Sequence, residues 1–135
     1  MTRILVGTDT SARADLAVSE AARLARLQGA ELLVLHVRPP HQVRDAADPE
    51  KVADPDGYLR GIRSRFPEIR TRTRTEIGDP AEGICRVARE EGADLIVVGN
   101  RGLDGHGRWF LRSVPARVTN RAPCSVYVVD TRRAA

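Results

Sequence analysis

Two short polar loops carry the residue types best suited to chemistry. The first, at 7–11, has the sequence Gly-Thr-Asp-Thr-Ser and directly follows an apolar run. Its carboxylate, Asp9, can accept hydrogen bonds from a bound ligand. Asp9 is also a candidate general base, but no second carboxylate or histidine is paired with it in the sequence, so ligand binding is the preferred interpretation.

The second loop, at 99–113, begins with Gly99 and Gly102 and ends at Ser113. Glycines let backbone N–H groups approach phosphate oxygens without a Cβ in the way. We expect Ser113 to cap a helix, which would add unpaired N–H donors and a hydroxyl at the end of the loop. Three arginines against one aspartate leave the loop net positive. The pattern favours phosphate binding, although a Gly-x-x-Gly pair alone is weak evidence.

The sequence around these loops alternates between short apolar runs and amphipathic segments. We expect strands at 4–6, 32–37, 69–77, 94–99 and 125–129, and helices at 12–28, 59–66, 80–91 and 113–122. Such alternation predicts the α/β class, with an open parallel sheet covered by helices on both faces. Ligands of such sheets bind beyond the carboxyl ends of the strands, where both polar loops lie.

Local signals fix several boundaries of these elements. Ser11 and Gly29 are the expected N-cap and left-handed C-terminal residue of the first helix. Asp79, followed by a proline and then by Glu82, has the form of a capping box. Residues 39–57 contain four of the eight prolines, so we expect a surface excursion there with at most broken helix.

Residues 69–77 alternate arginine and threonine and have the period of a strand without an apolar face. An edge strand is the preferred interpretation, because charges at a sheet edge discourage pairing with other sheets. The alternative is that these arginines form a basic surface patch that binds nucleic acid. The aromatic content of 4% argues against the stacking platforms that bind single strands.

Composition narrows the class of protein further. The 135 residues suffice for one domain, and no apolar run approaches the roughly 20 residues of a membrane span. The N-terminal apolar run is too short for a secretory signal, so a cytoplasmic location is expected. Cys85 and Cys124 lie outside any metal or redox spacing and are expected to be buried, reduced thiols. The net charge of +4, nearly all from arginine, is compatible with a phosphate ligand.

Five blocks of the chain, in order, closely resemble the universal stress protein family. They are 4–11, 35–37, 78–84, 93–102 and 122–126. The resemblance implies one universal stress protein domain over residues 1–135, with the adenine nucleotide alpha hydrolase-like arrangement of a five-stranded sheet in the order 3-2-1-4-5. It also implies that the last strand, through Val126, Val128 and Val129, pairs with its copy in a homodimer.

ATP-binding members of this family carry the motif Gly, two residues, Gly, nine residues, Gly, then Ser or Thr. Here Gly99, Gly102 and Ser113 are in register, whereas Arg112 stands in place of the third glycine. A left-handed backbone at Arg112 would cost roughly 1 to 2 kcal/mol, about tenfold in affinity. Its side chain could close the pocket, or its guanidinium could bind phosphate and contribute about 1.5 to 3 kcal/mol.

The resemblance implies a function and a set of contacts. The expected function is a regulatory, stress-response dimer that binds ATP, with or without Mg²⁺, and is not an enzyme beyond slow ATP hydrolysis. The alternative is a dimeric scaffold that has lost ATP binding through Arg112. Adenine and ribose would lie against Thr8, Asp9 and Val37. The phosphates would lie against Gly99, Arg101, Gly102, Ser113 and Val114.

Overall fold

A computed structural model of the chain describes residues 2–40, 54–100 and 109–131. Of residues 109–113 it describes the backbone alone. Five parallel strands form one sheet in the order β3-β2-β1-β4-β5, which confirms the predicted order. The elements in chain order are β1 (Arg3–Thr8), α1 (Ala12–Gln28), β2 (Glu31–Arg38), α2 (Pro55–Arg65), β3 (Thr71–Ile77), α3 (Pro80–Glu91), β4 (Leu95–Gly99), α4 (Trp109–Arg121) and β5 (Ser125–Val129).

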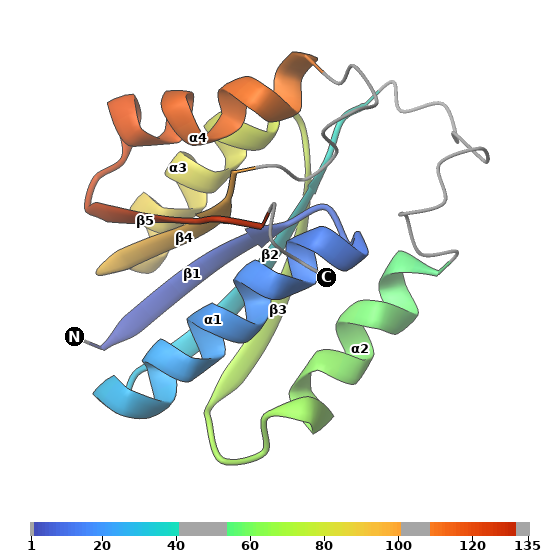
Figure 1. Ribbon diagram of the computed structural model, residues 1–135, viewed down its shortest axis with the longest axis vertical. Coiled ribbons are helices and arrows are strands. Elements are labelled where there is room, and N and C mark those ends of the chain that lie inside the picture. The colour runs from blue at the N-terminus through green and yellow to red at the C-terminus, as the bar shows by residue number, and fades with distance from the viewer. Residues whose placement is uncertain (1, 41–53, 101–108, 132–135) are drawn as a thin grey trace.

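Helices cover both faces of the sheet, α1 and α2 one face and α3 and α4 the other (Figure 1). Successive side chains of a strand point to opposite faces. Ile4 and Val6 of β1 therefore pack with α1 and α2, whereas Leu5 packs with α3 and α4. Among the described residues, no helix is long and apolar enough to cross a membrane.

The caps of α1 and α3 confirm the boundaries expected from the sequence. Ser11 Oγ accepts a hydrogen bond from the backbone N–H of Ala14 at 3.1 Å. Asp79 Oδ2 accepts one from the N–H of Glu82 at 2.9 Å. Both helices end at a left-handed glycine, with φ of 64° at Gly29 and 65° at Gly92. These four residues fix where the chain enters and leaves each helix.

Helix α2 begins earlier than expected. Asp54 caps it by accepting a hydrogen bond from the N–H of Gly57 at 3.0 Å, and Pro55 occupies the first turn. Proline is well suited to this place, because the N–H it lacks would have no helical partner there. The surface excursion predicted for residues 39–57 is therefore wrong for residues 55–57, which belong to α2. Residues 41–53 lie outside the described residues.

Helix α4 also begins earlier than expected, at Trp109 rather than at Ser113. Residues 109–112 include no glycine or proline, so nothing in them stops the helix from extending upstream of the serine. Ser113 is therefore not the N-cap, and Arg112 has a helical, right-handed backbone. Pro115 lies inside the helix. Because proline has no backbone N–H, the carbonyl of Leu111 lacks the usual helical donor four residues later.

Strand β3 lies at one edge of the sheet, as its sequence predicts. Arg72 Nη2 is 2.7 Å from a carboxylate oxygen of Glu91. Arg74 Nη2 is 2.8 Å from one of Glu90. These arginines bind carboxylates of β2, β3 and α3, namely Glu31, Glu76, Glu90 and Glu91. Because their charge is matched within the fold, the edge-strand interpretation is favoured over a nucleic-acid patch.

Candidate functional site

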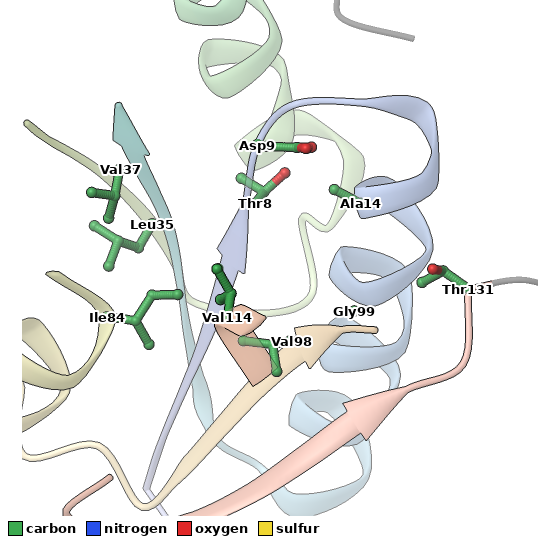
Figure 2. Close-up of a pocket in the computed structure, with 11 residues that line it drawn as sticks. Thr8, Asp9, Ala14, Leu35, Val37, Ile84, Val98, Gly99, Val114 and Thr131 are labelled. Atoms are coloured by element: carbon green, nitrogen blue, oxygen red, sulfur yellow. The ribbon is translucent and has the colours of Figure 1, made fainter. Parts of the chain in front are cut away.

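A pocket of about 70 Å³ opens beyond the carboxyl ends of the central strands (Figure 2). The ends of β1, β2 and β4 form its base, and α1, α3 and α4 each contribute one residue. The lining residues are Gly7, Thr8, Asp9, Ala14, Leu35, Val37, Ile84, Val98, Gly99, Val114 and Thr131. Ligand pockets usually measure about 300–1,000 Å³. The described residues therefore form the floor of a site rather than a complete enclosure.

The pocket has an apolar side and a polar side. Figure 2 shows Leu35, Val37 and Ile84 on one side and Thr8 and Asp9 across from them. Aliphatic side chains of this kind offer a surface on which a flat aromatic ring can lie. A carboxylate and a hydroxyl can bind donor groups at the rim of such a ring or on an attached sugar.

The loop that carries Asp9 is held by its own side chains. Thr8 Oγ1 accepts a hydrogen bond from the N–H of Thr10 at 2.9 Å, and Asp9 Oδ1 accepts one from the N–H of Ser11 at 2.9 Å. Ser11 in turn caps α1. Each of these side chains binds the backbone two or three residues ahead, so the loop is ordered before any ligand arrives.

Asp9 retains one oxygen for a ligand. Within the described residues, its Oδ2 is buried and has no hydrogen-bond partner. A buried acceptor without a partner costs about 1–3 kcal/mol, and more when it is charged. A carboxylate oxygen accepts hydrogen bonds, so a ligand that donates an N–H or O–H to Asp9 would recover this free energy.

Thr10 has a left-handed backbone, with φ of 65°, and its side chain is only 2% exposed. It is the one non-glycine residue with positive φ among residues 2–40, 54–100 and 109–131. A β-branched residue rarely adopts this conformation, and an L-residue pays about 1–2 kcal/mol for it. The strain lies beside the orphaned oxygen of Asp9, and strain of this kind is typical of functional loops.

The backbone of Gly99 lies close to the chain that follows β5. A Cβ at this position would be 2.9 Å from Cγ2 of Thr131, whose side chain is fully buried. Asn100 fixes the same contact, because its Oδ1 accepts a hydrogen bond from the N–H of Thr131 at 3.1 Å. The end of β4 and Thr131, the second residue after β5, thus form one wall of the pocket.

An ion pair joins the two helices on the apolar side. Arg117 of α4 donates from Nη1 and Nη2 to Oδ1 and Oδ2 of Asp79, at 3.0 and 2.7 Å. Burial raises the pKa of Asp79, but hydrogen bonds from Arg117 and from the N–H of Glu82 outweigh it and hold the pKa below its ordinary value. The pair keeps α3 and α4 in register where Ile84 and Val114 line the pocket.

The structure brings together five of the residues that the sequence predicts for the site, Thr8, Asp9, Val37, Gly99 and Val114. Val114 lies on the apolar side, although the resemblance implied a place near the phosphates. Arg101 and Gly102 lie outside the described residues, and Arg112 and Ser113 are described as the backbone of α4 alone.

Several pocket residues were not predicted from the sequence. Leu35, Val98 and Ile84 follow the ordinary periodicity of core residues. The closeness of Leu35 and Val98 to the ends of β2 and β4 was an available signal, whereas Ile84 lies inside α3 and had none. Thr131 follows the last strand and carried no signal, because only the fold brings it next to Gly99.

The cysteines take no part in the pocket. Cys85 is buried as expected, whereas Cys124 is partly exposed, and both are free thiols. Burial raises the pKa of each thiol, so both stay protonated near neutral pH. The described residues contain no group of three or more histidine, cysteine or acidic side chains placed to hold a metal ion.

The pocket lies where the chain order of the sheet reverses, between β1 and β4. Open α/β sheets bind their ligands at this point, so the fold and the site define an α/β ligand-binding domain. The model of the universal stress protein family matches residues 1–130, and the chain belongs to that family.

Relatives over nearly the whole chain agree with this assignment. Universal stress protein Sll1654 of Synechocystis sp. is 37% identical, and the alignment covers 93% of this chain and 83% of the relative. A universal stress protein solved in complex with cAMP is 30% identical, with a TM-score of 0.76, covering 96% of this chain and 97% of the other. The universal stress protein UspA from Lactobacillus plantarum is 28% identical, with a TM-score of 0.78, and the alignment covers 95% of this chain and 97% of UspA.

Proposed function

We propose that this universal stress protein binds an adenine nucleotide in the pocket between β1 and β4 and acts as a regulatory dimer. The buried Asp9 Oδ2, without a partner among the described residues, is the observation that carries the proposal. It is an acceptor beside an apolar wall, and an adenine nucleoside offers an amine, hydroxyls and a flat ring. The relative solved with cAMP supports the same ligand class.

The base of the nucleotide would lie on the apolar side of the pocket, against Val37 and Ile84. Asp9 would accept a hydrogen bond from a ribose hydroxyl or from the amine of adenine. A charge-assisted hydrogen bond of this kind is worth about 1.5–3 kcal/mol, a factor of roughly 10 to 150 in affinity.

The phosphates would extend from Gly99 along the loop after β4, toward Arg101, Gly102, Arg112 and Ser113. ATP, with or without Mg²⁺, is the ligand that this motif favours. The helical backbone at Arg112 supports binding, because a position with a right-handed backbone does not require glycine. The guanidinium of Arg112 is then a candidate phosphate ligand.

Calorimetric titration of ATP and of cAMP into the purified protein tests the proposal. We expect binding to the wild type, and a loss of about tenfold or more in affinity for Asp9→Ala. Asp56→Ala is the matched control, because Asp56 is exposed in the first turn of α2 and lies outside the pocket. Absence of heat with either nucleotide at high micromolar concentration, with the fold intact, would refute nucleotide binding.

A dimeric scaffold without nucleotide is the alternative that the arginine in the motif favours. The variant Arg112→Gly separates the two functions. If Arg112→Gly binds ATP and the wild type does not, the scaffold function is correct. If both bind, or if the variant binds more weakly, the nucleotide-binding function stands.

We propose that the dimer forms through β5, which lies at the other edge of the sheet from β3. Tyr127 and Val128 on this strand are 37% and 39% exposed, and an apolar edge strand is a surface that a second copy would cover.

We also propose that the protein is not an enzyme beyond slow ATP hydrolysis. Asp9 is the one titratable side chain among the described residues of the pocket, which gives a reaction no paired acid and base.

A further inference from the structure

The loop between β1 and α1 combines two features that the family assignment does not explain, a strained backbone at Thr10 and an orphaned oxygen at Asp9. They are adjacent in the chain. Thr10 is buried, and in the half-buried Asp9 the Oδ2 atom is buried. Glycine would adopt the same φ without strain, yet the sequence has a β-branched residue there. The strain is therefore maintained by the surrounding structure.

We infer that Thr10 is a positioning residue, whose left-handed backbone holds the Asp9 carboxylate in the geometry that receives the ligand. This inference rests on the proposed function, since it concerns how the proposed nucleotide site is ordered in advance. Thr10 touches no ligand in this scheme and is absent from the lining of the pocket. It acts through Asp9.

The hydrogen bonds of the loop give the mechanism. The turn at Thr10 brings the N–H of Ser11 back to Asp9 Oδ1 at 2.9 Å, which leaves Oδ2 as the oxygen for the ligand. The N–H of Thr10 itself is bound by Thr8 Oγ1 at 2.9 Å. Both carboxylate oxygens of Asp9 thus have defined roles, one within the loop and one toward the pocket.

The threonine side chain explains why the residue is not glycine. Thr10 is 2% exposed, so its branched side chain is packed on all sides and leaves the backbone little freedom. A glycine would relieve the strain, but it would also allow the loop to sample other conformations when no ligand is bound. Binding would then require the loop to be ordered again, and fixing one residue lowers affinity by about tenfold.

The test compares Thr10→Gly with Thr10→Asn, because asparagine tolerates the left-handed conformation better than other non-glycine residues. We expect Thr10→Gly to bind ATP or cAMP about tenfold more weakly while its urea midpoint stays close to that of the wild type. Thr10→Asn should bind within about threefold of the wild type. In the Asp9→Ala background, Thr10→Gly should cause no further loss. A merely structural role would instead lower stability and affinity together, with or without Asp9.

Amide hydrogen exchange of the ligand-free protein separates this inference from the proposed function. In Thr10→Gly, the protection factor of the Ser11 amide should fall about tenfold, because its acceptor is Asp9 Oδ1. The amide of Val18, inside α1, is the internal control and should be unchanged. If no adenine nucleotide binds the wild type, the proposed function fails, and exchange at Ser11 still decides the role of Thr10. Unchanged protection at Ser11, or full affinity in Thr10→Gly, would overturn the inference.

Discussion

Replacing Asp79 by alanine should destabilise the protein by about 2 kcal/mol, through two separable contributions. The first is the N-cap of α3, in which Asp79 Oδ2 accepts the N–H of Glu82 at 2.9 Å. Loss of such a cap typically costs about 1 kcal/mol. The second is the bidentate ion pair with Arg117. Because about a third of each side chain is exposed, we assign the pair about 0.5–1 kcal/mol.

Three variants separate these contributions by urea denaturation. Asp79→Ala removes both and should lower the urea midpoint by about 1 M, for a slope of about 2 kcal/mol per M. Asp79→Asn keeps the cap, since asparagine caps as well as aspartate, and Arg117→Met keeps the cap and most of the side chain. Each should shift the midpoint by about 0.25–0.5 M, at most half as much. Equal shifts for Asp79→Asn and Asp79→Ala would refute the assigned N-cap contribution.

The pH dependence of the same variants provides an independent check. The pKa of Asp79 in the folded protein lies below its ordinary value of 3.8. A carboxyl group whose pKa is lowered by folding stabilises the protein above the unfolded value, and this stabilisation is lost as the pH falls through the folded value. The difference in stability between wild type and Asp79→Asn should therefore be full at pH 7 and shrink below pH 3.8. A difference independent of pH would contradict the ion pair.

Three further predictions follow from packing, charge and exposure. Gly99→Ala should lower the free energy of unfolding by about 1–3 kcal/mol, because the new Cβ would lie 2.9 Å from Cγ2 of buried Thr131. The control, Gly61→Ala in α2, meets nothing within 4 Å and should raise it by about 0.5–1 kcal/mol. Equal urea midpoints for the two variants would contradict this. The hydrogen bond from Arg23 is the main reason that the pKa of Glu20 is about 2 rather than 4.5. The wild type should therefore be more stable than Glu20→Gln at pH 7, and the difference should disappear as the pH falls from 4.5 to 2. Urea titrations at several pH values measure this difference. Val128→Lys should convert the proposed dimer into a monomer in sedimentation velocity, whereas Ile77→Lys at the other edge should leave it intact; a dimer that survives Val128→Lys would place the interface elsewhere.

Local signals in the sequence were sufficient for most of the fold. Ser11 and Asp79 cap helices through atoms only three residues away, so their effect could be predicted without knowing the tertiary structure. The start of α4 could not, because Ser113 is a good capping residue but the residues before it are equally able to form helix.

The candidate site was predicted less completely than the fold. Thr8, Asp9 and Gly99 could be found because polar and small residues at strand ends mark ligand loops. Thr131 could not, because its contact with Gly99 depends on the pairing of β4 with β5. The left-handed backbone of Thr10 had no signal at all, since its residue type argues against that conformation.

The two edges of the sheet differ in what they can join. At β3 the arginines are matched by carboxylates of the same chain, whereas β5 presents Tyr127 and Val128 to solvent. A sheet with two receptive edges could add copies at both and grow into a filament. Pairing of β5 with its copy would occupy that edge in both copies, so association through β5 alone would end at two copies. At the opposite edge, the charged side chains along β3 are expected to discourage a further copy from adding to the sheet, and Ile77 is the exposed apolar residue of that strand.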